Sequence, residues 1–295
     1  MSTLDQYPTR PATAFNATAQ AERVALAAER RAGVAVTEAE TPETLREVSV
    51  LLESVWGRTE EGVPVNSDIL RSLVHAGGAV TTACTHDGAL VGAAVLSVAA
   101  PAGSTYSLIA AVAPGSRDRG IGQAVKLAQR AWALARDYRT MLWTFDPLVG
   151  RNARFNLAKL GAVAAEYEPS FYGQMTDAIN VADESDRLVA CWALDSRRVV
   201  AATEGTAGDP DGPAADAEVI ASGPDGAPML VRDEDALWCR VPADVVALRG
   251  QRPAEATAWR TEVRRALAPA LADGLAATHV TRSGWYRLTG QEDLR

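Results

Sequence analysis

Cysteine and histidine are scarce in this chain of 295 residues. Three of each are present, all far apart in the sequence: Cys84, Cys191, Cys239, His75, His86 and His279. An odd and dispersed set of cysteines excludes a disulfide scaffold, and neither residue type clusters as a set of metal ligands would. We therefore expect no metal.

Long apolar runs are also missing. The most apolar stretch, residues 89–102, is shorter than the roughly 20 residues that cross a bilayer, and its valines favour a buried strand. The first twenty residues are polar and contain no signal-peptide core. These features predict a soluble cytoplasmic protein without a membrane partner.

Basic side chains are outnumbered by acidic ones. The 29 Lys and Arg residues against 37 Asp and Glu residues give a formal net charge of -8, whereas nucleic-acid-binding proteins normally carry a basic face. We expect no nucleic-acid partner. The hydrophobic fraction of 47% is that of an ordinary globular protein, and the length suits one large or two modest domains.

Hydrophobic periodicity and turn residues predict alternating helices and strands. Helices are expected over residues 21–32, 41–55, 67–75, 121–137, 151–160 and 254–273, and strands over 34–37, 79–85, 89–99, 106–112, 140–145, 162–167, 188–194, 236–241, 277–281 and 285–288. Asp87-Gly88 is a hairpin signal, and the later strands are separated by helices. This order predicts an α/β fold with a mixed sheet and helices on both faces.

Composition suggests three parts. Residues 1–33 are expected to form an arm and a short helix, residues 34–195 the main domain, and residues 196–295 a C-terminal extension. Gly, Pro, Ala and Asp dominate residues 204–228, which predicts a flexible segment within that extension.

The most informative segment is residues 112–123, Val-Ala-Pro-Gly-Ser-Arg-Asp-Arg-Gly-Ile-Gly-Gln, between a strand and a long amphipathic helix. Gly120 and Gly122 let a ligand approach the backbone, and first-turn amides with the helix dipole favour an anion there. Arg117 and Arg119 add positive charge. The segment indicates a pyrophosphate-binding turn, with a plain glycine turn and two solvated arginines as the alternative.

Two other nucleotide motifs do not fit the same segment. A dinucleotide-binding fingerprint needs a third glycine where Val125 stands, and the Gly-Lys-Ser/Thr of a P-loop is absent.

The sequence resembles the GNAT superfamily of acyl-CoA-dependent N-acyltransferases over about residues 34 to 195. The resemblance rests on Val112, Pro114, Arg117, Gly120 and Gly122 in order, and is reinforced by Asn152-Ala153 and Lys159-Leu160-Gly161. Further residues resemble a branch with a long C-terminal extension, known mostly as predicted acetyltransferases, some associated with succinyl transfer to amino acids. These are Trp143 to Leu148, Phe155-Asn156, Tyr172-Gly173 and Ser185-Asp186-Arg187.

The resemblance implies a central mixed, largely antiparallel sheet flanked by helices, with an additional C-terminal α/β segment. Backbone amides of Arg119, Gly120, Ile121, Gly122 and Gln123 would hold the pyrophosphate of acetyl-CoA or another acyl-CoA. The strand ending at Val112 would pair with the pantetheine arm, and the Val112 amide would be the oxyanion donor.

Asn152 or Asn156 would face the sulfur or the pantetheine amides of the same cofactor. Helix capping and local backbone bonding are an equally weighted alternative for both asparagines.

The catalytic acid and base depart from the family pattern. Leu157 stands where the family has the tyrosine that acts as general acid. The strand 106–112 contains no carboxylate that could act as general base. Tyr172 and Tyr167 are candidate acids, with packing on the core as the favoured alternative. Asp146 is a candidate base or amine ligand if its pKa is raised, and a turn residue before Pro147 otherwise.

The sequence therefore predicts direct acyl transfer to a small amine or an amino acid, with acetyl-CoA as the default donor. The alternatives are succinyl transfer and a CoA-binding protein without turnover. A third hypothesis makes the C-terminal part a module that forms a homodimer.

Overall fold

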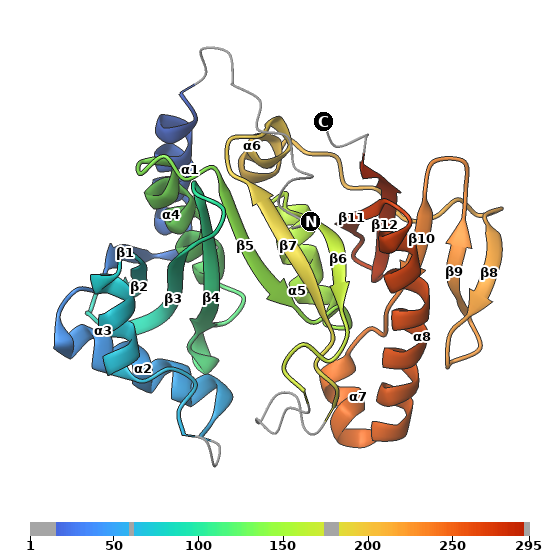
Figure 1. Ribbon diagram of the computed structural model, residues 1–295, viewed down its shortest axis with the longest axis horizontal. Coiled ribbons are helices and arrows are strands. Elements are labelled where there is room, and N and C mark those ends of the chain that lie inside the picture. Colours follow the sequence, from blue (N-terminus) through green and yellow to red (C-terminus); the bar gives the residue numbers. More distant parts are fainter. Residues whose placement is uncertain (1–15, 59–61, 174–182, 292–295) are drawn as a thin grey trace. The chain divides into compact units, whose positions relative to one another are not determined.

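The computed structural model describes residues 16–58, 62–173 and 183–291, and these divide into two compact units (Figure 1). The first, here the N-terminal unit, holds the described residues up to 143 together with 193–196. The second, the C-terminal unit, holds residues 144–192 and 197–291 apart from the gap. The predicted main domain, 34–195, draws on both units, and its boundaries stay predictions.

The N-terminal unit contains five strands in the order β1-β2-β3-β4-β5. They are β1 (Val34–Glu38), β2 (Ala79–Thr85), β3 (Leu90–Ala99), β4 (Ser104–Val112) and β5 (Thr140–Phe145), whose last two residues fall in the other unit. Pairing is antiparallel from β1 to β4, and β5 joins β4 in parallel. The sheet of this unit is therefore mixed, as the sequence predicts.

Helices cover both faces of that sheet. They are α1 (Ala17–Ala32), α2 (Pro42–Trp56), α3 (Ser67–His75) and α4 (Ile121–Leu134), with a short 3-10 turn, η2 (Pro114–Ser116), before α4. Ala93 and Val95 of β3 pack with α2 and α3 in one core, while α4 packs on the face of Gly92. Because successive residues of a strand face opposite sides, the two sets of helices lie on opposite faces.

The polar residues of α4 depart from expectation. Helical periodicity predicts that Gln123, Lys126, Gln129 and Arg130 lie away from the apolar face of α4, but Lys126, Gln129 and Arg130 are buried. Lys126 and Gln129 face the sheet, where both bond to Ser107 of β4, whereas α1 packs against α4 and covers the side of Arg130. Arg130 accordingly donates from Nη1 to Oε1 of Gln20 on α1 at 2.7 Å.

The C-terminal unit contains strands in the order β7-β6-β11-β12-β10-β9-β8, with every neighbouring pair antiparallel. They are β6 (Val163–Glu168), β7 (Arg187–Ala193), β8 (Glu218–Ser222), β9 (Pro228–Arg232), β10 (Leu237–Arg240), β11 (Leu275–Val280) and β12 (Trp285–Gly290). Its helices are α5 (Gly150–Arg154), the π-helical turn η3 (Phe155–Lys159), α6 (Arg197–Glu204), α7 (Val245–Gln251) and α8 (Pro253–Ala272). The long helix α8 packs against β6, β10 and β11.

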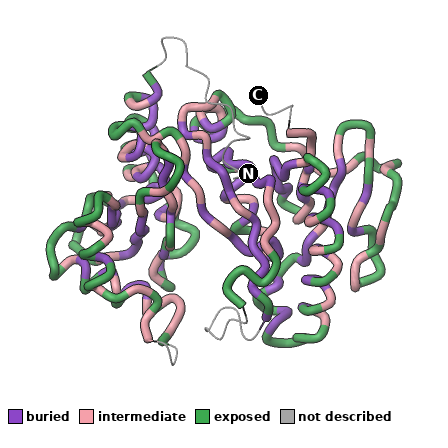
Figure 2. Tube along the Cα trace, viewed as in Figure 1, coloured by how far each residue is buried: buried purple, intermediate pink, exposed green. Residues whose placement is uncertain are grey.

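The predicted fold class is confirmed: a mixed, mostly antiparallel arrangement of strands flanked by helices, with an additional C-terminal α/β segment. The structure adds α6, α7, β8 and β9, and it places β8 inside the segment 204–228. The sequence analysis did not predict β8. Figure 2 shows that β8 is largely exposed whereas the central strands are buried, so β8 lacks the apolar pattern of a buried strand. In the part of the chain that the structure describes, no helix is both long and apolar enough to cross a membrane.

Candidate functional site

An open strand edge lies in the middle of the N-terminal unit. Strand β4 pairs with β5 only from Ser104 to Tyr106, although β4 continues to Val112. On its other side it pairs with β3, with a bulge at Leu108, because Val95 faces Ile109 and Leu96 faces Ser107. Along residues 107–112, no strand among the described residues covers the edge turned away from β3.

The backbone of Val112 points toward this open edge. The Ala113 N–H donates to the Val91 carbonyl at 2.9 Å. In an antiparallel ladder the neighbouring pair, Val112 opposite Gly92, is then the pair whose N–H and C=O groups turn outward. The Val112 N–H is thus available to an acceptor beside β4.

The chain turns from β4 into α4 through a segment rich in unpaired amides. Gly120 is the N-cap of α4 in the left-handed conformation, with φ 82°, and no side chain caps the helix. The first helical bond runs from the Ala124 N–H to the Gly120 carbonyl at 3.0 Å. The N–H groups of Ile121, Gly122 and Gln123 therefore have no intrahelical acceptor.

The turn and the strand end meet at Gly122. A Cβ built there would lie 3.7 Å from Cγ2 of Val112. Arg117 and Arg119 are exposed on the turn, with Asp118 between them. The structure thus brings together the seven predicted cofactor-binding residues of this unit: Val112, Arg117, Arg119, Gly120, Ile121, Gly122 and Gln123.

A buried lysine lies beside the point where β4 and β5 separate. Lys126 Nζ donates to Ser107 Oγ at 3.0 Å, and it stands 4.0 Å from the centre of the Trp143 ring. Burial lowers the pKa of Lys126 to about 7. Sequence reasoning missed this group, because its burial depends on the packing of α4 against β4 and β5, which supply Ser107, Met141 and Trp143.

The two predicted asparagines belong to the C-terminal unit and differ from each other. Asn152 is exposed on α5, whereas Asn156 is buried in the π-helical turn. The Nδ2 of Asn156 has no hydrogen-bond partner among the described residues. Asn156 therefore keeps a free amide donor among the described residues.

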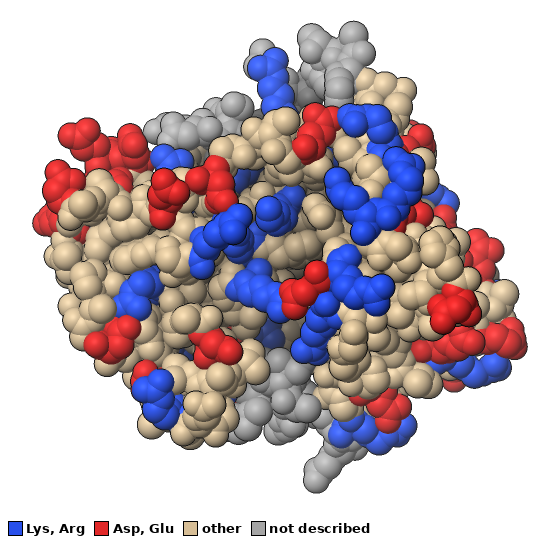
Figure 3. All heavy atoms as spheres, turned by 180° about the vertical axis from the view of Figure 1, so that it is seen from behind, with Lys and Arg blue, Asp and Glu red and all other residues tan. Residues whose placement is uncertain are grey.

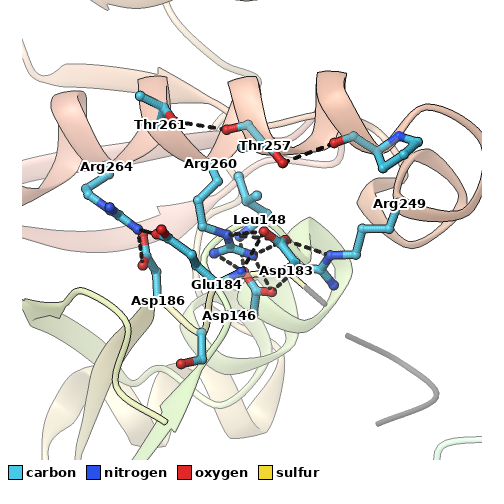
Figure 4. Close-up of polar contacts among 12 residues, drawn as sticks. Asp146, Leu148, Asp183, Glu184, Asp186, Arg249, Thr257, Arg260, Thr261 and Arg264 are labelled. Carbon is cyan, nitrogen blue, oxygen red and sulfur yellow. Dashed lines mark hydrogen bonds and ion pairs between the residues drawn. The ribbon is translucent and has the colours of Figure 1, made fainter. Parts of the chain in front are cut away.

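Asp146 lies in a buried ion-pair network rather than in an open site. Figure 4 shows its carboxylate between Arg249 of α7 and Arg260 of α8, with Asp183 bound to the same two guanidinium groups. The side chains of Asp146 and Arg260 are 7% and 2% exposed. Asp146 also accepts a bond from the Leu148 N–H at 2.9 Å, as the turn alternative predicts.

The electrostatics of Asp146 do not suit a base. Burial by itself would raise the pKa of Asp146, but the guanidinium groups of Arg260 and Arg249 outweigh it and hold the pKa below its ordinary value. Base catalysis at neutral pH requires the opposite direction. The buried ion pairs and the lowered pKa of Asp146 favour a structural role over that of a base.

The two candidate tyrosines have different surroundings. Tyr172 is 54% exposed and lies outside the strands, so the alternative of core packing is wrong for it. Its hydroxyl is 3.5 Å from Thr144 Oγ1. Tyr167 donates to Asp186 Oδ2 at 2.5 Å, and burial together with that carboxylate raises its pKa. Of the two, only Tyr172 is an exposed residue.

The surface carries charges of both signs. On the face drawn in Figure 3, exposed Lys and Arg side chains lie among Asp and Glu side chains. Among the described residues, no three His, Cys, Asp or Glu side chains form a group that could hold a metal ion.

Comparison with known proteins gives a likeness in structure alone. No protein-family model matches the chain, and no curated protein matches it. An IAA acetyltransferase from Bacillus cereus is 17% identical, with 54% of this chain and 97% of that protein covered and a TM-score of 0.42.

Two further solved structures are described as GNAT proteins. A phosphinothricin acetyltransferase from Sinorhizobium meliloti, in complex with AcCoA, is 18% identical over 54% of this chain and 87% of its own, with a TM-score of 0.44. An acetyltransferase from Elizabethkingia anophelis with acetyl-CoA bound is 14% identical over 55% and 98%, with a TM-score of 0.41. Each of these likenesses covers about half of this chain.

Proposed function

We propose that the chain is an acyl-CoA-dependent N-acyltransferase, with acetyl-CoA as default donor and a small amine or amino acid as acceptor. The observation that carries the proposal is the open edge of β4, which ends at Val112 beside the uncapped start of α4. A strand edge and a helix start are two different binding surfaces, and here they adjoin.

Each surface matches one part of an acyl-CoA. The pantetheine arm contains amide groups, which pair with a free strand edge as an added strand does. A diphosphate suits the amides of Ile121, Gly122 and Gln123, because a helix N-terminus favours anions. Arg117 and Arg119 add positive charge at the same turn.

The outward N–H of Val112 supplies the chemistry at the end of the arm. Attack of a neutral amine on the thioester carbonyl forms a C–N bond and puts negative charge on the carbonyl oxygen. A backbone N–H aimed at that oxygen stabilises the charge. The C–S bond then breaks, the thiolate takes up a proton, and the nitrogen loses one.

Acyl transfer also needs a proton donor for the thiolate and a proton acceptor for the amine. Tyr172 is the remaining candidate acid, since the residue is 54% exposed. Because the pKa of Asp146 is lowered, the amine is expected to enter deprotonated by solvent. Holding amine and thioester in attack geometry then accounts for much of the acceleration.

A CoA-binding protein without turnover is the second candidate function. Two observations favour it: Leu157, at the position expected for the acid, is buried and apolar, and the pKa of Asp146 is lowered.

Calorimetry and a thiol assay separate the two functions. The full chain is titrated with acetyl-CoA, succinyl-CoA and CoA, and thiol release is then followed over a panel of amines and amino acids. Binding with thiol release supports the transferase and identifies acceptor and donor. Binding without release from any acceptor supports the second function, and no binding of any thioester contradicts both.

A further inference from the structure

A hollow of about 180 Å³ lies within the C-terminal unit. Its walls come from the π-helical turn η3, from α6 with the segment after it, and from the hairpin of β11 and β12. Small residues leave the space, among them Ala158, Ala201, Ala202 and Gly208, and Leu157 adds an apolar wall. Single π-helical turns occur frequently at functional sites.

Two arginines line this hollow without a counter-charge. Arg198 donates to the carbonyls of Gly161 and Thr278, which leaves its Nη1 without an acceptor among the described residues. Arg287 is half-buried, and its guanidinium makes no hydrogen bond to them. No carboxylate of the described residues lies within ion-pair distance of either one.

The one nearby carboxylate is already engaged. Asp209 accepts bonds from Arg154 Nη1 at 2.9 Å and Nη2 at 2.6 Å, and from His279 Nε2 at 2.9 Å. Its negative charge is therefore paired with Arg154 and His279 and not with the two arginines that line the hollow. Burial, and then the like charge of Arg287, lower the pKa of Arg198, which indicates a site short of negative charge.

We propose that this hollow binds a small dianion, with Arg198 and Arg287 as its ligands. Two guanidinium groups without carboxylates are matched by two negative charges, and guanidinium binds both phosphate and carboxylate oxygens. A cavity of about 150 Å³ accepts benzene, so the present volume suits a ligand of roughly six to eight non-hydrogen atoms. The proposal does not depend on the acyltransferase function.

The two arginines have different tasks in this site. Arg198 is fixed by the two carbonyls and so presents Nη1 in a set position. Arg287 has all of its donors available, with the Trp238 ring 6.0 Å from its guanidinium carbon. Removing Arg287 consequently perturbs the fold less than removing Arg198, which makes Arg287 the residue to test.

The test is calorimetry on the full chain in a buffer free of phosphate and carboxylate. The probes are inorganic phosphate, malonate, glutarate and, as a monoanion, acetate. Variants are Arg287→Gln, which removes charge, and Ala201→Leu, which fills the hollow. Arg282→Gln is the matched control, because its side chain is 84% exposed on the same hairpin. Gly122→Asp reports separately on the turn proposed for CoA.

We expect one dianion in the hollow, bound more tightly than acetate. Arg287→Gln and Ala201→Leu should each weaken it about tenfold or more, while Arg282→Gln and Gly122→Asp leave it within about twofold. Tighter binding of phosphate identifies a phosphoryl ligand, and tighter binding of malonate or glutarate a dicarboxylic acid. Three results overturn the proposal: no dianion binds, acetate binds equally well, or folded Arg287→Gln keeps full affinity.

Discussion

The two units bury charge in different ways. In the N-terminal unit, Lys126 is set against a hydroxyl, a thioether and an aromatic ring, and burial lowers its pKa to about 7. In the C-terminal unit, Asp146 is buried just as deeply, yet its pKa is lowered and it stays charged, because Arg260 and Arg249 surround it.

Burial alone therefore does not decide whether a charge survives. Desolvation disfavours the charged form of each group, and only the fixed opposite charges of the second site outweigh it. A lysine that is neutral for much of the time is a proton acceptor near neutral pH, whereas a paired carboxylate is locked in one state. The comparison assigns a structural role to the network and leaves proton chemistry to other groups.

Removing Arg260 should have the largest effect. Arg260→Met leaves Asp146 and Asp183 buried with only Arg249 between them, and breaking a buried ion pair from one side costs about 3–5 kcal/mol. Urea unfolding of the full chain, with each transition fitted separately, measures the loss. The control is Arg265→Met on the same helix, where a pair with Glu262 is 71% exposed on the arginine side and is worth at most about 1 kcal/mol. Equal losses in the two variants would show that the network contributes nothing special.

Replacing Lys126 should change how stability depends on pH. Its pKa is about 7 in the folded chain against 10.5 as the ordinary value, so the unfolded chain binds more protons between these limits. Stability then rises with pH across that window. From about pH 7.5 to about pH 9.5 the wild type should gain on the order of 2 kcal/mol relative to Lys126→Met.

The second lysine of the chain provides the control for that experiment. Lys159 is exposed, so Lys159→Met removes the same charge without changing a buried site. Its stability should follow the wild-type slope. If Lys126→Met also follows that slope, Lys126 is not neutralised by burial.

The turn before α4 is a third charged site, and unlike those of Lys126 and Asp146 it is exposed. Gly122→Asp puts a carboxylate where a diphosphate is proposed to bind, and should weaken acetyl-CoA about tenfold or more in calorimetry. The fold should remain intact, since a Cβ at this position lies 3.7 Å from the nearest side chain and an acidic residue suits the first turn of a helix. Gly122→Ala, the size control, should keep its affinity within a few fold. Undiminished affinity in the aspartate variant refutes the placement.

Local signals in the sequence predicted most of the fold. Thr41 caps α2 through a bond from the Thr44 N–H at 3.2 Å, and the Asp87-Gly88 turn joins β2 to β3. Such signals act within a few residues. Strand β8 escaped prediction because it is mostly exposed and is held by its pairing with β9, so it carries no apolar alternation.

The burial and the pKa of the charged groups could not be predicted from the sequence. The glycines of the turn were identifiable because backbone geometry requires them locally. The partner of Asp146, however, stands 114 positions away at Arg260, and the groups around Lys126 come from β4 and β5. A pKa depends on such distant neighbours, so its direction could not be derived before the tertiary structure was known.

Removing the Ser107 hydroxyl beside Lys126 should have the smallest effect of these changes. Ser107 Oγ accepts a bond from Lys126 Nζ at 3.0 Å, and a hydroxyl oxygen stabilises the ammonium more than the amine. Ser107→Ala should therefore lower the pKa of Lys126 further below about 7, by less than about one unit, since one such bond is worth about 1 kcal/mol. NMR of lysine-labelled protein measures this directly, because the chain has only two lysines and Lys159→Met assigns the pair. As a control, Ser97→Ala on the neighbouring strand should leave the titration of Lys126 unchanged. A rise of the Lys126 pKa in Ser107→Ala would contradict the prediction, because it would mean that the hydroxyl donates to a neutral amine.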